Sequence, residues 1–209
     1  MASLLIELQY LPPLEYFTAL LKHSQCLIDI HENYQKQSYR NRCYLCTTHG
    51  VQALSIPVVK GNTKQKMKDV RIDYTQKWLQ VHWRTITSSY GKAPFFEYYI
   101  DFFYDIFFKK PTFLTDLNQS LLTLCLRLID IQIPVVYTEK YIEKGEFTDM
   151  TDARAAIHPK KSYRQNLFYM PKSYEQHFGS EFVPNMSILD LLFCEGNNAK
   201  YILCESLHS

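Results

Sequence analysis

The first thirty residues carry the pattern that most restricts the fold. Residues 3–9 are an apolar run that predicts a short buried strand, and Pro12 and Pro13 end it. Pro13 suits the first turn of a helix, which the apolar-rich residues 14–21 continue. Residues 26–30 are again apolar and favour a strand. Because two parallel strands are joined by a crossover, this order predicts an N-terminal βαβ unit in an α/β fold with a mixed or mainly parallel sheet.

The remaining chain predicts flanking helices and an inserted hairpin. Residues 43–47 and 51–59 have the pattern of paired strands that turn at Gly50. Helices are predicted over residues 75–90, 95–108 and 111–131, and further strands over residues 70–74 and 134–137. Leucines in the third of these helices recur at spacings of three and four, which indicates a helix packed on the sheet. Dimerisation through the same leucines is the alternative.

The chain is expected to form a single domain over residues 1–209, because this length can bury an ordinary hydrophobic core. Residues 139–182 are polar and lack clear periodicity, which indicates a lid or a loop-rich region. Helical order returns over residues 184–193, where Asn185 or Ser187 can act as the cap.

Composition and charge exclude several classes of protein. The formal net charge is only +2, so no overall field attracts nucleic acid. The apolar run 95–108 is shorter than a bilayer crossing, and the N-terminal residues do not resemble a signal peptide. We therefore predict a cytoplasmic protein with no membrane insertion and with reduced cysteines. Cys43 and Cys46 have the spacing of a metal-ligand pair but lack a second pair, so no metal is predicted.

Residues 31–42 form a polar stretch in which we expect the chemistry. They follow the second predicted strand, and open α/β sheets bind ligands at the carboxyl ends of their strands. His31 can serve as a general base near neutral pH, with Asp29 or Glu32 orienting it, although a structural histidine is the alternative. Glycine-rich nucleotide-binding motifs are absent from the sequence, so positively charged side chains would have to contact a bound phosphate. The alternative role of these side chains is to form salt bridges on the surface. The candidate cations are Lys36, Arg40, Arg42 and Lys92.

Five ordered motifs resemble those of the WbqC-like family. Residues 8–17 are similar to its opening motif, residues 34–42 to its K-x-S-[WY]-x-N-R element, and residues 54–58 to its L-x-[VI]-P-V strand. Residues 185–193 are similar to its N-[LM]-S-I-L-D-L-[LI]-F close. The W-x3-H and Y-x-K-A-P-[YF] signatures are matched by Trp78, His82, Tyr90, Lys92, Ala93 and Pro94. The chain departs from the family at Pro13 and Glu15, which replace the usual Trp and Gly. It departs again at His31-Glu32, which stands where many relatives carry two acids.

This resemblance implies an enzyme of bacterial surface-polysaccharide (O-antigen-type) biosynthesis that transfers an acyl or aminoacyl (glycyl) group to an amino sugar. His31 or Asp29 would deprotonate the sugar amine, and the cations would hold phosphate or carboxylate. The further ligand-binding residues would be Gln9, Tyr34, Asn41 and His82. The expected substrate is a small molecule such as a sugar nucleotide, the cofactor stays unidentified, and enzymes of the same pathway are the expected protein partners. A non-catalytic sugar-nucleotide-binding or scaffold protein of that pathway is the alternative.

Overall fold

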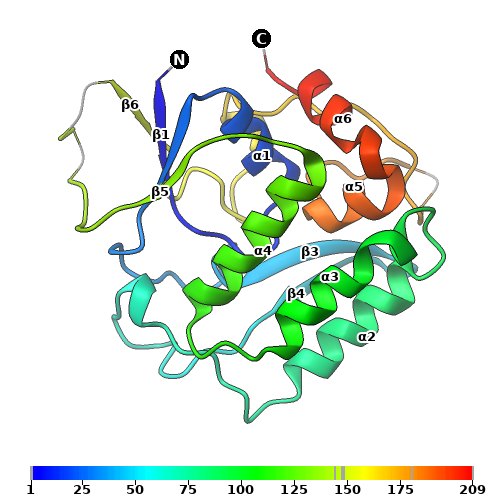
Figure 1. Ribbon diagram of the computed structural model, residues 1–209, viewed down its shortest axis with the longest axis horizontal. Helices are drawn as coiled ribbons and strands as arrows, with labels where there is room; N and C mark the ends of the chain where they lie inside the picture. Colours follow the sequence, from blue (N-terminus) through cyan, green and yellow to red (C-terminus); the bar gives the residue numbers. More distant parts are fainter. Residues whose placement is uncertain (1, 144, 147–148, 180, 209) are drawn as a thin grey trace.

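The computed structural model describes residues 2–143, 145–146, 149–179 and 181–208. Its centre is a four-stranded parallel sheet with the strand order β5-β2-β1-β6 (Figure 1). The strands are β1 (Ser3–Ile6), β2 (Gln25–Ile28), β5 (Val135–Tyr137) and β6 (Met150–Asp152). The register aligns Ser3 with Gln25 on one side of β1 and with Met150 on the other. The carboxyl ends of all the strands therefore meet at one edge.

The N-terminal βαβ unit is confirmed. Helix α1 (Leu14–Leu21) connects the parallel strands β1 and β2, as the sequence pattern predicts. Strand β1 ends at Ile6 rather than at residue 9, because the backbone then turns to bond other segments. The Tyr10 amide, for example, donates to the carbonyl of Tyr39 over 2.8 Å. The chain thus leaves the sheet earlier than its apolar composition suggests.

The predicted hairpin is also confirmed and lies apart from the parallel sheet. Strands β3 (Arg42–Thr47) and β4 (Gly50–Ser55) pair antiparallel. Gly50 has a φ of +91° at the turn, a conformation that favours glycine. The predicted strand over residues 70–74 is wrong. Its backbone groups bond separate segments, with the Ile72 amide donating to Thr112 and Val70 accepting from Leu114, so no continuous ladder forms.

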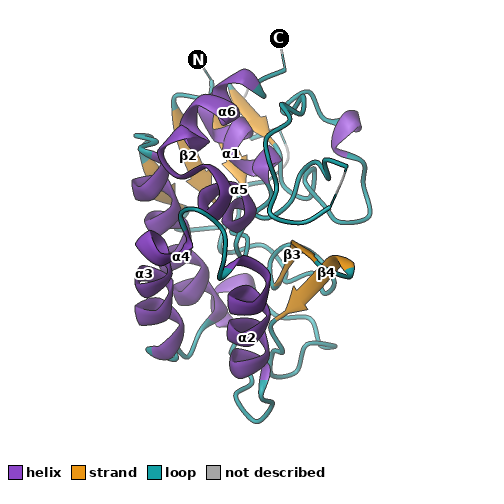
Figure 2. Ribbon diagram, turned by 90° about the vertical axis from the view of Figure 1, so that its right-hand side faces the viewer, coloured by secondary structure: helices purple, strands orange, loops and turns teal. Residues whose placement is uncertain are grey.

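Helices flank the sheets, and Figure 2 shows α2 (Trp78–Tyr90) beside the hairpin, whose other side is not covered by a helix among the described residues. The further helices are α3 (Phe96–Phe108), α4 (Leu114–Ile129), α5 (Ile188–Glu195) and α6 (Ala199–Glu205), with short 3-10 turns at Met67–Asp69, Tyr163–Gln165 and Gly196–Asn198. Ser187 caps α5, since its hydroxyl accepts from the Leu189 amide. Helix α6 is absent from the sequence-based prediction. Among the described residues, no helix has both the length and the apolar character to cross a membrane.

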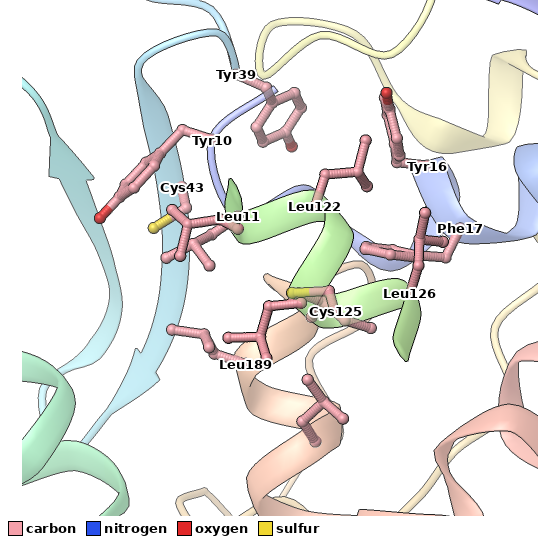
Figure 3. Packing of buried hydrophobic residues seen from close by; sticks show 14 of the residues in the cluster. Tyr10, Leu11, Tyr16, Phe17, Tyr39, Cys43, Leu122, Cys125, Leu126 and Leu189 are labelled. Carbon is pink, nitrogen blue, oxygen red and sulfur yellow. The ribbon is translucent and has the colours of Figure 1, made fainter. Parts of the chain in front are cut away.

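Helix α4 lies at the centre of the hydrophobic core. Figure 3 shows Leu122 and Cys125 of this helix close to Leu11, with Leu189 of α5 below them. All of these side chains are at most 1% exposed. The leucine seam of α4 is buried inside the chain as well, because Leu114, Leu117 and Leu121 are 0% exposed and Leu124 is 4% exposed. This burial agrees with the intramolecular interpretation.

Candidate functional site

The topology of the parallel sheet identifies its most favourable ligand position. The chain passes from β1 to β2 and then outward to β5, and it returns to the other side of β1 as β6. Open parallel sheets usually bind ligands outside the carboxyl ends of the strands at the point where the strand order reverses. In this chain that point lies between Glu7, directly after β1, and Ala153, directly after β6.

Charged side chains from three strands and the polar stretch meet at this edge. We call them the sheet-edge cluster: Glu7, Asp29, Glu32, Arg40 and Arg154. The Arg40 side chain is 0% exposed and that of Arg154 is 7% exposed, and the three acids are no more than 5% exposed. Charged residues are seldom buried to this degree, because removing charges from water is unfavourable unless they are paired. Clusters of this kind are enriched at functional sites.

Arg40 is held in the cluster by a bidentate ion pair with Glu32. Its Nε lies 2.6 Å from Glu32 Oε1 and its Nη2 lies 2.7 Å from Glu32 Oε2. The Arg40 backbone carbonyl accepts from Asn118 Nδ2 at 2.8 Å, which anchors it to α4. The remaining nitrogen, Nη1, is 3.7 Å from Glu7 Oε1 and makes no hydrogen bond within the described part of the chain.

Glu7 and Gln9 form the other half of this arrangement. Glu7 Oε1 accepts from Gln9 Nε2 at 2.9 Å, and Glu7 Oε2 accepts from the Ala155 amide at 2.8 Å. Gln9 Nε2 also donates to the carbonyl of Ile157, and this hydrogen bond connects the segment that follows β6 to the segment that follows β1. Gln9 Oε1 is buried and has no partner among the residues described. Within the described part of the chain, Arg40 Nη1 is thus an unused donor and Gln9 Oε1 an unused acceptor.

Asp29 pairs with Arg154 at the end of β2. Asp29 Oδ2 lies 2.6 Å from Arg154 Nη1, and Asp29 Oδ1 accepts from the His31 amide at 2.9 Å and from the Thr138 hydroxyl at 3.3 Å. Hydrogen bonds to Asp152, followed by those to Asp29, raise the pKa of Arg154 despite its partial burial. The Asp29 carboxylate is thus engaged in ordering the site, and it positions the backbone of His31.

Glu32 and His158 in this region also have shifted pKa values. Burial raises the pKa of the Glu32 carboxyl to about 7, against the lowering influence of Arg40. Burial and the charge of Arg40 lower the pKa of His158, a half-buried residue that follows β6. Sequence reasoning did not place Glu7, Arg154 or His158 in the site. Glu7 was hidden because the sequence predicted a strand over residues 3–9, whereas the other two depend on β6, which has no apolar pattern.

The predicted site residues divide into separate groups. Gln9, Asp29 and Arg40 meet at the sheet edge with the backbone of His31. Arg42 lies on the hairpin and donates from Nε to Ser55 Oγ at 2.8 Å. Lys92 is exposed and lines a different pocket, together with His177 and Glu195. A further pocket beside the hairpin is lined by Tyr34, Lys36, Asn41 and His82. The predicted cations therefore do not converge on one point.

His82 is enclosed by hydrogen-bonding partners. Its Nδ1 lies 3.0 Å from the Tyr10 hydroxyl and its Nε2 lies 3.3 Å from the carbonyl oxygen of Ser55. Because a carbonyl oxygen can only accept, Nε2 carries the hydrogen and Nδ1 accepts from Tyr10. Burial lowers the pKa of His82 to about 4, so the ring is neutral at physiological pH.

Comparisons with known proteins agree with the motifs. The model of the WbqC-like protein family matches residues 9–202. An uncharacterized protein from Mycobacterium tuberculosis is 28% identical over 219 residues, which cover 93% of this chain and 94% of that protein. No solved structure gives a significant match.

Proposed function

Because the chain belongs to the WbqC-like protein family, we propose that it is an enzyme of bacterial surface-polysaccharide biosynthesis. The proposed reaction transfers an acyl or aminoacyl group to the amine of an amino sugar in the cytoplasm. The observation that carries the proposal is the burial of the sheet-edge cluster at the point where the strand order reverses. Its unused donor and acceptor, Arg40 Nη1 and Gln9 Oε1, suit a small polar substrate.

The proposed step forms an amide and releases the activating group of the donor. The sugar amine attacks the carbonyl carbon of the activated acyl group, the C–N bond forms, and the bond to the leaving group breaks. His31 accepts the proton that the amine loses and returns it to the leaving group. Asp29 acts as a positioning residue, since its carboxylate already accepts from the His31 amide and pairs with Arg154. Arg40 Nη1 faces the developing negative charge on the carbonyl oxygen.

The first experiment identifies the ligand class before any reaction is assumed. Thermal unfolding is measured with sugar nucleotides, with coenzyme A thioesters, and with ATP plus amino acids, because a ligand that binds only the folded chain raises Tm. Turnover is then measured with the acceptor and donor that stabilise the protein. Formation of an N-acylated sugar is the expected result. A complete lack of stabilisation by every donor class would refute the transferase proposal.

The role of His31 has its own test. Replacing His31 by Gln is expected to reduce kcat by about a hundredfold or more, because the base is lost, while substrate affinity stays close to that of the wild type. The matched control is His49→Gln, which changes an exposed histidine at the hairpin turn. Unaltered activity of the His31 variant between pH 6 and 8 would mean that another group is the base.

The alternative is a non-catalytic sugar-nucleotide-binding or scaffold protein of the same pathway. The hairpin pocket favours it, because His82 is neutral there and both of its ring nitrogens are engaged. Tyr34 in the same wall has its pKa raised to about 12 by burial, so it is not a base at neutral pH. Saturable binding of a sugar nucleotide without turnover in the presence of any donor class would favour this alternative.

A further inference from the structure

A second candidate site lies beside the hairpin, apart from the sheet-edge cluster. The pocket has a volume of about 630 Å³ and lies between β4, the loop after it and the first turns of α2. Small-molecule sites commonly have volumes of this order. Arg40 and Asn41 are neighbours in sequence, yet Arg40 pairs with Glu32 at the sheet edge whereas Asn41 lines this pocket. The polar stretch therefore contributes to two different places.

Asn41 and Trp78 each bring to the pocket wall a buried polar atom that has no hydrogen-bond partner among the described residues. Asn41 Nδ2 donates to the carbonyl of Ile56 at 2.7 Å, but Asn41 Oδ1 makes no hydrogen bond to any part of the chain that is described. The indole Nε1 of Trp78 is likewise unpaired among the described residues, and Trp78 is only 5% exposed. The Trp78 ring packs against Tyr74 and His82, with centroid separations of 5.7 and 5.0 Å. Unpaired buried groups are unfavourable, so an acceptor and a donor held here indicate a ligand rich in hydroxyl groups.

The charge of the pocket indicates an anionic group on the same ligand. Lys36 and Lys77 line it, and the described lining residues include no carboxylate. Lys36 Nζ is directed to Asn62 Oδ1, 3.2 Å away, at the same wall. The 13-residue helix α2 begins at the pocket. Its N-cap residue is Lys77, and among the described residues the Lys77 side chain makes no hydrogen bond that caps the first amides of the helix. The amides at a helix N-terminus carry partial positive charge and favour phosphate.

We infer that the hairpin pocket binds a phosphorylated sugar, with Asn41 and Trp78 contacting hydroxyl groups and Lys36, Lys77 and the start of α2 contacting phosphate. Trp78 Nε1 and Asn41 Oδ1 are shielded from solvent, so binding includes a small adjustment of the wall around them. The inference rests on the proposed function only in naming a sugar. The sugar phosphate can be free or part of a nucleotide, and these two sources share the chemistry that the pocket recognises.

Calorimetric titration with glucose 1-phosphate, glucose, inorganic phosphate and UDP-glucose tests the inference. Glucose 1-phosphate is expected to bind at least about tenfold more tightly than glucose or inorganic phosphate, because only it satisfies both parts of the pocket. Tighter binding of UDP-glucose would identify a nucleotide-linked ligand, and equal binding would identify the sugar phosphate as the recognised unit. Binding of inorganic phosphate as tight as that of glucose 1-phosphate, or no binding of either sugar phosphate, would overturn the inference.

Conservative variants locate the binding. Trp78→Phe removes the indole N–H and keeps an aromatic ring, and Lys36→Met removes one cation. Each is expected to weaken binding of glucose 1-phosphate by about fivefold or more. The matched controls are Trp83→Phe, which lies outside this pocket on α2, and Lys64→Met, an exposed lysine outside the lining. Unchanged affinity in both pocket variants, with Tm values like that of the wild type, would overturn the inference.

The same experiment separates this inference from the transferase proposal. Binding that is lost in Trp78→Phe but retained in His31→Gln, with no turnover in the wild type, would support the pocket and refute the transferase. Turnover in the wild type, together with unchanged binding of glucose 1-phosphate in both pocket variants, would overturn the pocket and leave the transferase standing.

Discussion

The clearest quantitative consequence of the structure concerns protonation of His82. Its Nδ1 accepts from the Tyr10 hydroxyl and its Nε2 donates to the carbonyl of Ser55. Protonation would place a hydrogen on Nδ1 directly opposite the Tyr10 hydroxyl and would introduce a charge into a residue that is 3% exposed. The folded protein therefore keeps the ring neutral down to acidic pH, whereas the unfolded chain protonates it at the ordinary pKa.

The free energy follows from the two pKa values. Burial lowers the pKa of His82 from 6.5 to about 4, which corresponds to about 3 kcal/mol at full protonation of the unfolded chain. Because the unfolded chain binds the additional proton, this contribution to stability is present above pH 6.5 and is lost as the pH falls from 6.5 to 4. Between pH 7.5 and pH 5 the loss is about 2 kcal/mol.

The assay is urea unfolding of the wild type and of His82→Gln at several values between pH 7.5 and pH 5. The variant has no titrating ring, so its free energy of unfolding should fall by about 2 kcal/mol less than that of the wild type over this range. Other titrating groups are common to both proteins and cancel in the difference. His49→Gln changes an exposed histidine and should retain the pH dependence of the wild type. Equal pH dependence in His82→Gln and in the wild type would refute the reasoning.

Two further predictions concern buried charges. Replacing Arg40 by Met should lower the free energy of unfolding in urea by about 3–5 kcal/mol, because Glu32 and Glu7 lose their buried partner. The double variant Arg40→Met, Glu32→Gln should regain part of this loss, and a double variant no more stable than the single one would contradict the pairing. Burial raises the pKa of the Glu15 carboxyl from 4.5 to about 7. Between these two pH values the folded protein keeps Glu15 protonated, whereas the unfolded chain releases the proton. The stabilising contribution of the protonated carboxyl is therefore lost as the pH rises from 4.5 to 7. Glu15→Gln should remove this component from a pH series of urea unfolding, and an unchanged series would exclude it.

Local sequence patterns were sufficient for the parts of the fold that depend on neighbouring residues. The βαβ unit follows from an apolar run, a proline pair and a second apolar run, and the hairpin follows from alternating strands around Gly50. Strand β6 could not be found in this way. Its three residues, Met150–Asp152, have no apolar pattern, and they become a strand because β1 offers them an unpaired edge. The region expected to be a lid or loop thus supplies one edge of the sheet.

The candidate site was predictable in position but not in the direction of its side chains. The polar stretch was expected at the carboxyl ends of the strands, and Glu32 and Arg40 do lie there. Its composition could not show that Arg40 would pair with Glu32 and Glu7. Glu7 lies within the run that the sequence predicts as a strand, residues 3–9, and looks like an ordinary interruption of that apolar run. Nor could it show that Asn41, the next residue, would line a separate pocket.

The energetic character of the sheet-edge cluster argues that it is more than a structural device. A buried ion pair contributes little net stability compared with apolar residues of the same volume, because the attraction between the charges mainly offsets their removal from water. Arg40 makes this balance less favourable still, because Nη1 lies without a hydrogen bond among the described residues and 3.7 Å from the nearest Glu7 oxygen. Gln9 Oε1 is likewise buried without a hydrogen-bond partner among the described residues. Apolar side chains at these positions would serve fold stability better. We therefore propose that a bound substrate completes the unused hydrogen-bonding groups.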